Sequence, residues 1–191
     1  MEKLASLRPG SNRADRVNLF INGTPLISNS SEPMSAWGAK TSEAAQCISC
    51  EDLSGDPQSK YLLRAEFEMT VTREMLNPRG TMHGGFQVTL FDNLSSFAVA
   101  GFDRYWEGYS DEEKTIDIFV PIKRVAKMMG VSRTLTATFL RAVSEGDLVK
   151  MEVFVVAETK TFTVITGRVY DKQGRVATEF FHDKVKVAAR I

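Results

Sequence analysis

The segment from Asn77 to Asp92 constrains this chain most, because a turn there leads directly into a long apolar helix that carries one acid. Its sequence is NPRGTMHGGFQVTLFD. The turn formers at 77–80 end any preceding strand. Apolar residues then recur at helical spacing, at Phe86, Leu90, Leu94, Phe97, Ala98 and Gly101. We therefore predict a helix from Gly84 to about Gly101 that is buried on most of its faces.

The first turn of this predicted helix contains His83, Gly84 and Gly85. The first N–H groups of a helix lack intrahelical acceptors and lie at the positive end of the helix dipole. Two glycines leave these groups uncovered. A carbonyl oxygen that gains negative charge would be stabilised there, so the sequence predicts an oxyanion hole.

Asp92 is an acid within this apolar helix. An ionised carboxylate in such a segment is costly unless it is paired, and its presence indicates a functional task. The alternative is an acid that caps or bridges to a neighbouring chain.

His83 and Asp92 are nine positions apart. At about 100° and 1.5 Å per residue they lie on opposite helix faces, roughly 13 to 14 Å apart along the axis. They cannot meet within one straight helix. If both serve one site, Asp92 of one protomer faces the partner's His83 across a twofold interface. The spacing therefore predicts a dimer.

The remaining pattern is typical of an α+β protein with one antiparallel sheet around one long helix. Alternating runs separated by turn signals predict strands over 62–72, 133–140, 149–157, 161–170 and 176–187. Pairing two such sheets edge to edge would remove an exposed strand edge, which is a second reason to expect a dimer.

The turn and helix resemble the hotdog-fold acyl-CoA thioesterases, in the branch of the phenylacetate-pathway and mammalian small thioesterases. That family has an Asn, a Gly-x-x-His-Gly-Gly turn, and an Asp nine residues after the His. Asn77, the segment 80–85 and Asp92 match these positions. Further on, 130–141 with Gly146-Asp147 resembles the family's second strand and the turn after it. The resemblance covers about residues 60 to 188 and implies the hotdog fold.

The resemblance also implies roles for the matched residues. Asp92 would be the nucleophile or general base, and the Gly84 N–H would be the oxyanion donor. Asn77 and His83 would position the thioester or the water, and Ser132 would assist the water. A thioester has a good leaving group, so its hydrolysis needs no separate acid catalyst. A carboxylate that activates water, together with helix-terminal N–H groups that polarise the carbonyl, is enough for the reaction. No cofactor is expected, with coenzyme A entering only as part of the substrate.

Binding of coenzyme A requires exposed cations for its phosphates. Arg141, Lys160, Arg168 and Lys184 lie on or beside predicted strands, and Gly85 adds a further N–H group. The cations have no specific spacing, and surface lysines and arginines usually only solvate a protein.

The chain departs from the family at about 102–129, an insertion between the helix and the second strand. It contains Phe102, Tyr105, Trp106, Tyr109 and Phe119. It is expected either to cover the acyl tail as a lid or subunit contact, or to be an ordinary surface excursion. Residues 1–58 are rich in Ser, Asn, Gly and Pro and are expected to form an extension with one short helix over 36–47, before a thioesterase domain at 59–191.

Composition excludes some classes of protein. The chain has 24 basic and 24 acidic residues, which argues against a nucleic-acid-binding protein. No apolar run approaches the roughly 18 to 20 residues of a membrane span, so a cytoplasmic protein is expected. A mitochondrial location stays open because Arg8, Arg13 and Arg16 lie among serines near the N-terminus.

Cys47 and Cys50 are the only cysteines, and a zinc site would need two further ligands from elsewhere. No metal site is therefore predicted. His182 lies in the last predicted strand and is interpreted as a satisfied or half-exposed strand residue.

Three functions compete. Hydrolysis of acyl thioesters, on coenzyme A or on a carrier protein, is favoured because the glycines suit a thioester carbonyl. A hotdog hydratase or dehydratase would place its acid and histidine close together, and a noncatalytic acyl-binding dimer would not need Asp92. Fatty, aromatic and polyketide acyl chains all stay open, and the aromatic insertion favours a longer or aromatic tail in lipid metabolism. A homotetramer is common in the family and is not readable from this sequence.

Overall fold

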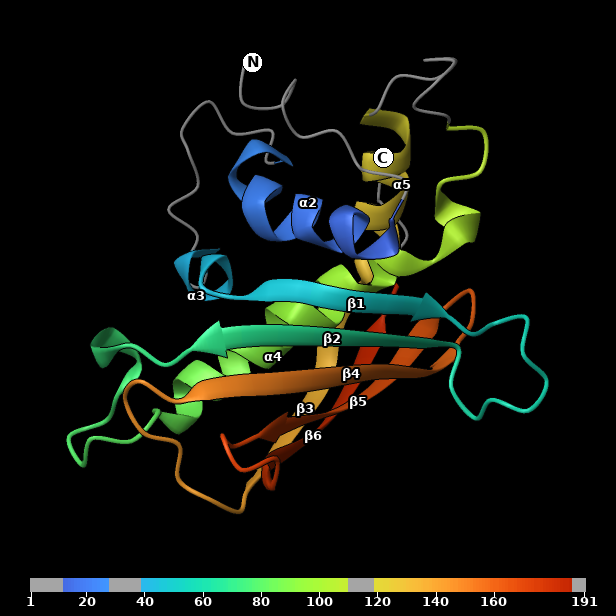
Figure 1. Ribbon diagram of the computed structural model, residues 1–191. Coiled ribbons are helices and arrows are strands. Elements are labelled where there is room, and N and C mark those ends of the chain that lie inside the picture. The colour runs from blue at the N-terminus through green and yellow to red at the C-terminus, as the bar shows by residue number, and fades with distance from the viewer. Residues whose placement is uncertain (1–11, 28–38, 110–118, 187–191) are drawn as a thin grey trace.

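One antiparallel sheet curves around a single long helix, α4 (Gly84–Ala98), in the computed structural model (Figure 1), which describes residues 12–27, 39–109 and 119–186. The strand order is β1-β2-β4-β5-β6-β3. The strands are β1 (Gln46–Asp52), β2 (Leu63–Thr70), β3 (Val131–Phe139), β4 (Leu148–Glu158), β5 (Phe162–Tyr170) and β6 (Val176–Val185). This arrangement confirms the predicted α+β hotdog fold.

The strands alternate between a face that packs on α4 and a face that points away from it. In β4, Val149, Met151, Val153 and Val155 are buried, while the residues between them are more exposed. Leu90, Phe91 and Leu94 of α4 are buried among the inward-facing residues. Burial of these apolar side chains stabilises the fold by about 25 cal/mol per Å² of apolar surface removed from water.

Helix and sheet approach each other closely at Gly167 in β5. A Cβ atom there would lie 2.2 Å from Cε2 of Phe91 and 2.6 Å from the carbonyl oxygen of Glu152. The Phe91 ring also stacks on Phe180 of β6, with 4.3 Å between the ring centroids. The absence of a side chain at position 167 therefore lets Phe91 lie against the sheet backbone.

The N-terminal residues contribute to the sheet, which the sequence analysis did not predict. β1 lies within the segment 1–58 assigned to an extension, and it pairs with β2. Its polar sequence and a bulge between Cys47 and Ser49 hide the alternation that marks a strand. The helix expected over 36–47 is only the short α3 (Ala39–Glu43), and residues 36–38 lie outside the described part.

An unpredicted helix, α2 (Arg13–Ile27), lies along β1 (Figure 1). The side-chain amide of Asn18 bonds to the backbone of Cys47 in both directions, each at 2.9 Å. Arg13 and Arg16 make ion pairs with Asp103 at 2.6 and 2.8 Å. The helix is therefore held to both the strand and the segment that follows α4.

The aromatic residues at the start of the insertion belong to the core. Phe102, Tyr105 and Trp106 are buried. The Trp106 Nε1–H donates to the carbonyl of Ala100 at 2.7 Å, and the Tyr105 hydroxyl donates to Glu158 at 2.6 Å. The interpretations of these residues as a lid, a subunit contact or a surface excursion are therefore wrong. Residues 110–118 and the Phe119 side chain lie outside the described part.

The insertion ends in α5 (Phe119–Met129), which leads into β3. Its residues Ile122 and Val125 are buried. Among the described helices, none has both the length and the apolar character that a membrane span requires.

Replacing Gly167 with Ala should lower the free energy of unfolding by about 1 to 3 kcal/mol, because the added methyl group would overlap Phe91 and a backbone oxygen. Chemical denaturation measures this change. Gly55→Ala is the matched control, since a Cβ atom at that position would meet nothing within 4 Å. Equal stability of the two variants would contradict the packing described for Phe91.

Candidate active site

Asp92 lies on α4, and its side chain is 40% exposed. The hydroxyl of Ser132, near the start of β3, donates a hydrogen bond to Asp92 Oδ1 at 2.7 Å. One end of the carboxylate is therefore held while the side chain stays accessible from outside. Asp92 and Ser132 therefore lie side by side in the structure, even though a long insertion separates them in the sequence.

His182 is fully buried beneath this pair. Its Nε2 lies 2.9 Å from Ser132 Oγ, and its Nδ1 lies 2.8 Å from Ser95 Oγ on α4. Because the single hydroxyl proton of Ser132 is directed at Asp92, we assign the proton on Nε2 to a hydrogen bond with Ser132 Oγ. The imidazole thus fixes the orientation of the Ser132 hydroxyl.

Burial lowers the pKa of His182 from its ordinary value of 6.5 to about 4, and the nearby Lys184 ammonium contributes to that lowering. The Asp92 carboxylate, 3.4 Å from Nε2, acts in the opposite direction. At neutral pH the ring is therefore uncharged. A neutral imidazole has one donor and one acceptor nitrogen, which matches its two serine partners.

Lys184 adds a buried cation to the group. Its Nζ lies 2.8 Å from Ser96 Oγ, 3.3 Å from Ser132 Oγ and 3.7 Å from Asp92 Oδ1. Burial lowers the pKa of Lys184, and the Asp92 carboxylate opposes this change. The expectation of Lys184 as an exposed cation for coenzyme A phosphates is wrong, because its side chain is only 3% exposed.

The helix N-terminus forms a second group of candidate residues. His83 is the N-cap of α4, and its Nδ1 accepts a hydrogen bond from the Gly85 N–H at 2.9 Å. The Gly85 N–H, which was expected to bind substrate, is therefore already bonded to His83. The Gly84 N–H, at the first helical position, has no intrahelical acceptor. Gly84 therefore remains as the candidate oxyanion donor.

A surface pocket of about 320 Å³ adjoins Gly84. It is lined by Asn77, Thr81, Met82, Gly84, Gln87 and the segment 139–142. The Asn77 amide donates to Thr81 Oγ1 at 2.9 Å and accepts from the Arg79 N–H at 2.9 Å. Asn77 thus faces the pocket while its side chain holds the turn together.

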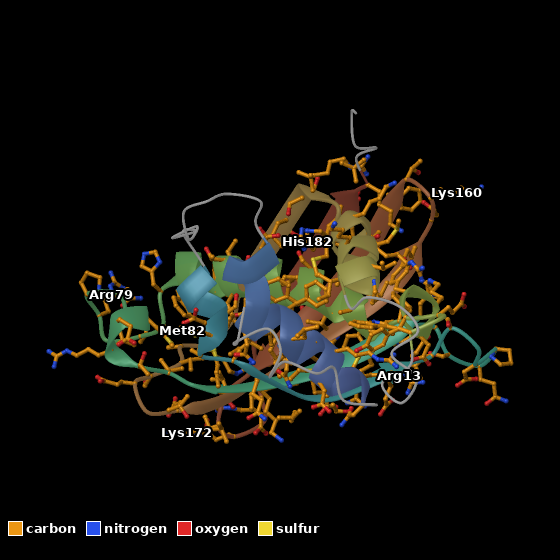
Figure 2. The ribbon with its side chains drawn as sticks, turned by 90° about the horizontal axis from the view of Figure 1, so that it is seen from above. Arg13, Arg79, Met82, Lys160, Lys172 and His182 are labelled. Carbon is orange, nitrogen blue, oxygen red and sulfur yellow. The ribbon has the colours of Figure 1, made fainter. Side chains whose placement is uncertain are left out.

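The predicted cations occupy separate places. Arg141 lines the Gly84 pocket, and its Nη1 donates to the carbonyl of Val176 at 2.5 Å. Arg168 alternates with the inward-facing Val169 and pairs with Glu179 at 3.1 Å, on the sheet face away from α4. Lys160 lies exposed in the turn between β4 and β5, on the opposite side of the molecule from Arg79 (Figure 2).

Within one chain the candidate residues therefore form two groups. Asn77, His83, Gly84 and Arg141 lie at the N-terminal end of α4, and Asp92, Ser132, His182 and Lys184 lie farther along it. Figure 2 shows Met82, next to the first group, well apart from His182 in the second. The prediction that His83 and Asp92 do not meet in one chain agrees with this separation.

Neither His182 nor Lys184 was predicted to lie beside Asp92, and Lys184 was expected only as a coenzyme A contact. They are two residues apart in β6 and share the inward face with Phe180. A polar pair that continues the apolar face of a strand was the available signal. His182 is a satisfied strand residue, as interpreted, but one of its two hydrogen-bond partners is Ser132 of the candidate site.

The two cysteines are buried thiols in β1. Burial raises the pKa of Cys47 to about 12 and raises that of Cys50 as well. Both are therefore protonated at neutral pH and are poor nucleophiles and ligands. The described residues contain no group of three or more His, Cys, Asp or Glu side chains placed to bind a metal ion.

A family model described as the thioesterase superfamily matches residues 79–178, just over half of the chain. The chain therefore belongs to the thioesterase superfamily, which confirms the resemblance and the expectation of a thioesterase. No curated protein matches it.

Solved structures show the same fold at low sequence identity. Thioesterase superfamily member 2 from zebra fish has a TM-score of 0.58 at 19% identity, with 90% of this chain and 98% of that chain covered. A hypothetical thioesterase protein with coenzyme A from Streptococcus pneumoniae has a TM-score of 0.55 at 17% identity, with 78% of this chain and 90% of that chain covered. The Escherichia coli PaaI protein from the phenylacetic acid degradation operon has a TM-score of 0.52 at 20% identity, with 78% of this chain and 88% of that chain covered.

The buried neutral His182 should make folding stability depend on pH. The unfolded chain binds a proton near pH 6.5 and the folded chain only near pH 4, so stability falls as the pH drops through this window. The slope contributed by one such group is at most about 1.4 kcal/mol per pH unit. Urea unfolding of the native protein and of His182→Gln between pH 4 and 7 measures it. An unchanged slope in the variant would show that His182 is not the group responsible.

Proposed function

We propose that this protein hydrolyses acyl-CoA thioesters at a site shared between two copies of the chain. The observation that carries the proposal is the contact of Ser132 with the half-exposed Asp92 carboxylate, supported from below by neutral His182 and buried Lys184. A carboxylate and a hydroxyl at this spacing can together hold and deprotonate a water molecule. The electrophile-binding group, Gly84, then comes from the other copy.

The position of β3 supports a shared site. β3 is an edge strand of the sheet, and its apolar residues Val131 and Phe139 are 57% and 51% exposed. An unpaired, partly apolar edge favours pairing with another strand. The start of β3 carries Ser132, and the Phe139 ring at its end lies against Gly84. Antiparallel pairing of two β3 strands about their centres would bring the start of one beside the end of the other.

In the proposed mechanism the thioester carbonyl oxygen accepts a hydrogen bond from the Gly84 N–H at the positive end of α4. The partner's Asp92 either deprotonates a water that attacks the carbonyl carbon, or attacks that carbon itself. In the second case the thiolate leaves an acyl–Asp92 anhydride, which water then hydrolyses to the free acid and the Asp92 carboxylate. The partner's Ser132 orients the water or the carboxylate. The thiolate leaves without an acid catalyst because thiols are good leaving groups. Negative charge that develops on the oxygen is stabilised by a preorganised N–H group.

His182 and Lys184 contribute to this site without contacting substrate. Both imidazole nitrogens are engaged by serines, and the ring is fully buried. The Lys184 ammonium balances the charge of the carboxylate that it faces at 3.7 Å.

A hydratase is the second candidate, because a histidine does lie 3.4 Å from Asp92. A hydratase would need that imidazole to exchange a proton with the substrate. The complete burial of His182 and its two serine partners disfavour such a role. Loss of enoyl-CoA absorbance on incubation with the protein would support hydration instead, and binding without turnover of any thioester would support the noncatalytic dimer.

Coenzyme A is the proposed thiol carrier because a structural neighbour of the same fold was solved with coenzyme A. Acyl groups on a carrier protein are the alternative substrate. The two are distinguished by comparing the same acyl group on coenzyme A and on a phosphopantetheinylated carrier.

Asp92→Asn should lower the rate of thiol release from acyl-CoA by about 10²-fold or more, because the amide keeps the shape of the side chain but is not basic. A panel of short, medium, long and aromatic acyl-CoAs, assayed with a thiol reagent, provides the measurement. Glu179→Gln, an equivalent change on the outer sheet face, is the control and should retain full activity. Undiminished activity of Asp92→Asn would overturn the proposal.

His83→Ala should also lose activity, because the side chain that caps the helix start beside Gly84 is removed. Mixing the His83→Ala and Asp92→Asn proteins should then restore about a quarter of native activity after random exchange of subunits, since half the dimers are mixed and each has one intact site. Differently tagged chains establish by co-purification that exchange has occurred. Exchange without any rescue would place the complete site within one chain.

A further inference from the structure

Phe139 lies directly beside the candidate oxyanion donor. A Cβ atom placed on Gly84 would lie 2.9 Å from Cζ of the Phe139 ring and 3.3 Å from both Cε atoms. The far edge of the ring therefore points at Gly84 and is in van der Waals contact with it. Phe139 remains 51% exposed, so much of the ring is not covered by its own chain.

The ring has a firmly held base. Phe139 is the last residue of β3 and pairs with the buried Thr178 of β6. The next two backbone N–H groups, of Leu140 and Arg141, both donate to the carbonyl of Ala177, at 2.8 and 3.0 Å. The Thr178 hydroxyl donates to Gln87 on the first turn of α4 at 2.6 Å. The strand end and the helix start are thus tied together, and the ring is a wall of the pocket that adjoins Gly84.

This position limits what can approach the Gly84 N–H. A carbonyl oxygen bonded to that N–H lies about 2.9 Å from the nitrogen. The carbonyl carbon and the first carbon of the acyl chain follow within two bond lengths. If the acyl chain leaves the carbonyl on the side of the Phe139 ring, extra methyl groups on the first acyl carbon would meet the ring before any more distant branch does.

We infer that Phe139 is a specificity-determining residue that restricts the substrate to acyl groups unbranched at the carbon next to the thioester. This inference rests on the proposed hydrolysis and on Gly84 as the oxyanion donor. Phe139 thus selects substrates by the substituents on the first acyl carbon. It does not contact the distal end of the acyl chain, which other parts of the pocket would bind.

The test compares the isomers butanoyl-CoA and 2-methylpropanoyl-CoA, which have the same atoms and differ only in whether the carbon next to the thioester is branched. Native protein should favour the straight isomer in kcat/KM, and Phe139→Ala should reduce that preference about 10-fold, since one methyl group in a pocket is worth roughly that factor. Phe139→Leu should give an intermediate ratio of kcat/KM for the two isomers. It replaces the alanine variant in the test if that variant folds poorly. A second pair, pentanoyl-CoA and 3-methylbutanoyl-CoA, carries the branch one carbon farther and should change little.

Phe181→Ala is the matched control, because Phe181 is similarly exposed at 41% but lies on the outer face of the sheet. It should leave the isomer ratio unchanged. An equal loss of kcat/KM for both isomers in Phe139→Ala and Phe139→Leu would show a merely structural or coenzyme A contact and overturn the inference. Native protein that releases no thiol above the Asp92→Asn background from any thioester would instead overturn the proposed function, and this inference with it.

Discussion

The packing of α4 into the concave face of the sheet is the contact on which the rest of the molecule depends. It relies on one position without a side chain, Gly167, against which the Phe91 ring lies. This contact sets the distance between helix and sheet, and therefore decides which helix residues reach β3 and β6. Ser95 and Asp92 meet their partners on these strands only because the helix lies this close.

The polar group around Asp92 shows how an acid is accommodated beside an apolar core. A buried or half-buried carboxylate loses hydration, and that cost must be offset by hydrogen bonds and opposite charge. Ser132 supplies the hydrogen bond and Lys184 supplies the charge. His182 takes no charge of its own, and it links the strand serine to the helix serine. The group is thus a connected network. Ser132 bonds to the carboxylate, Lys184 balances its charge, and His182 holds Ser132 in place.

Sequence patterns predicted the elements that have strong periodicity or distinctive turn residues. The helix after the His-Gly-Gly turn follows from helical spacing of apolar residues, and the five strands from residue 62 onward follow from alternation. The structure confirms them within a few residues. β1 was missed because its inward-facing residues are small cysteines interrupted by a bulge, so that burial leaves little trace in the hydropathy. Of the site, Asp92 and the glycine turn could be found because they break an apolar pattern. His182 and Lys184 could not, since their roles arise from tertiary contacts across the sheet.

The aromatic insertion shows a related limit. Aromatic residues in a region without family counterparts suggested a cover for substrate, yet Phe102, Tyr105 and Trp106 fill space beneath α2 and beside the end of α4. The same residue types serve a substrate pocket and a protein core equally well. Only the packing partners decide between them, and these include α2, which the sequence pattern did not reveal.

The location of α2 and β1 bears on where this chain can be shortened. The family resemblance begins at about residue 60, and a chain cut there would lack both elements. Its β2 strand would become an edge with an unpaired row of N–H and C=O groups, next to the uncovered apolar residues that now contact α2. Such edges promote association between chains. α2 and β1 therefore cover a sheet edge and an apolar surface of the folded unit, and a shortened protein that precipitates would report the loss of that cover and not a defect in the thioesterase site.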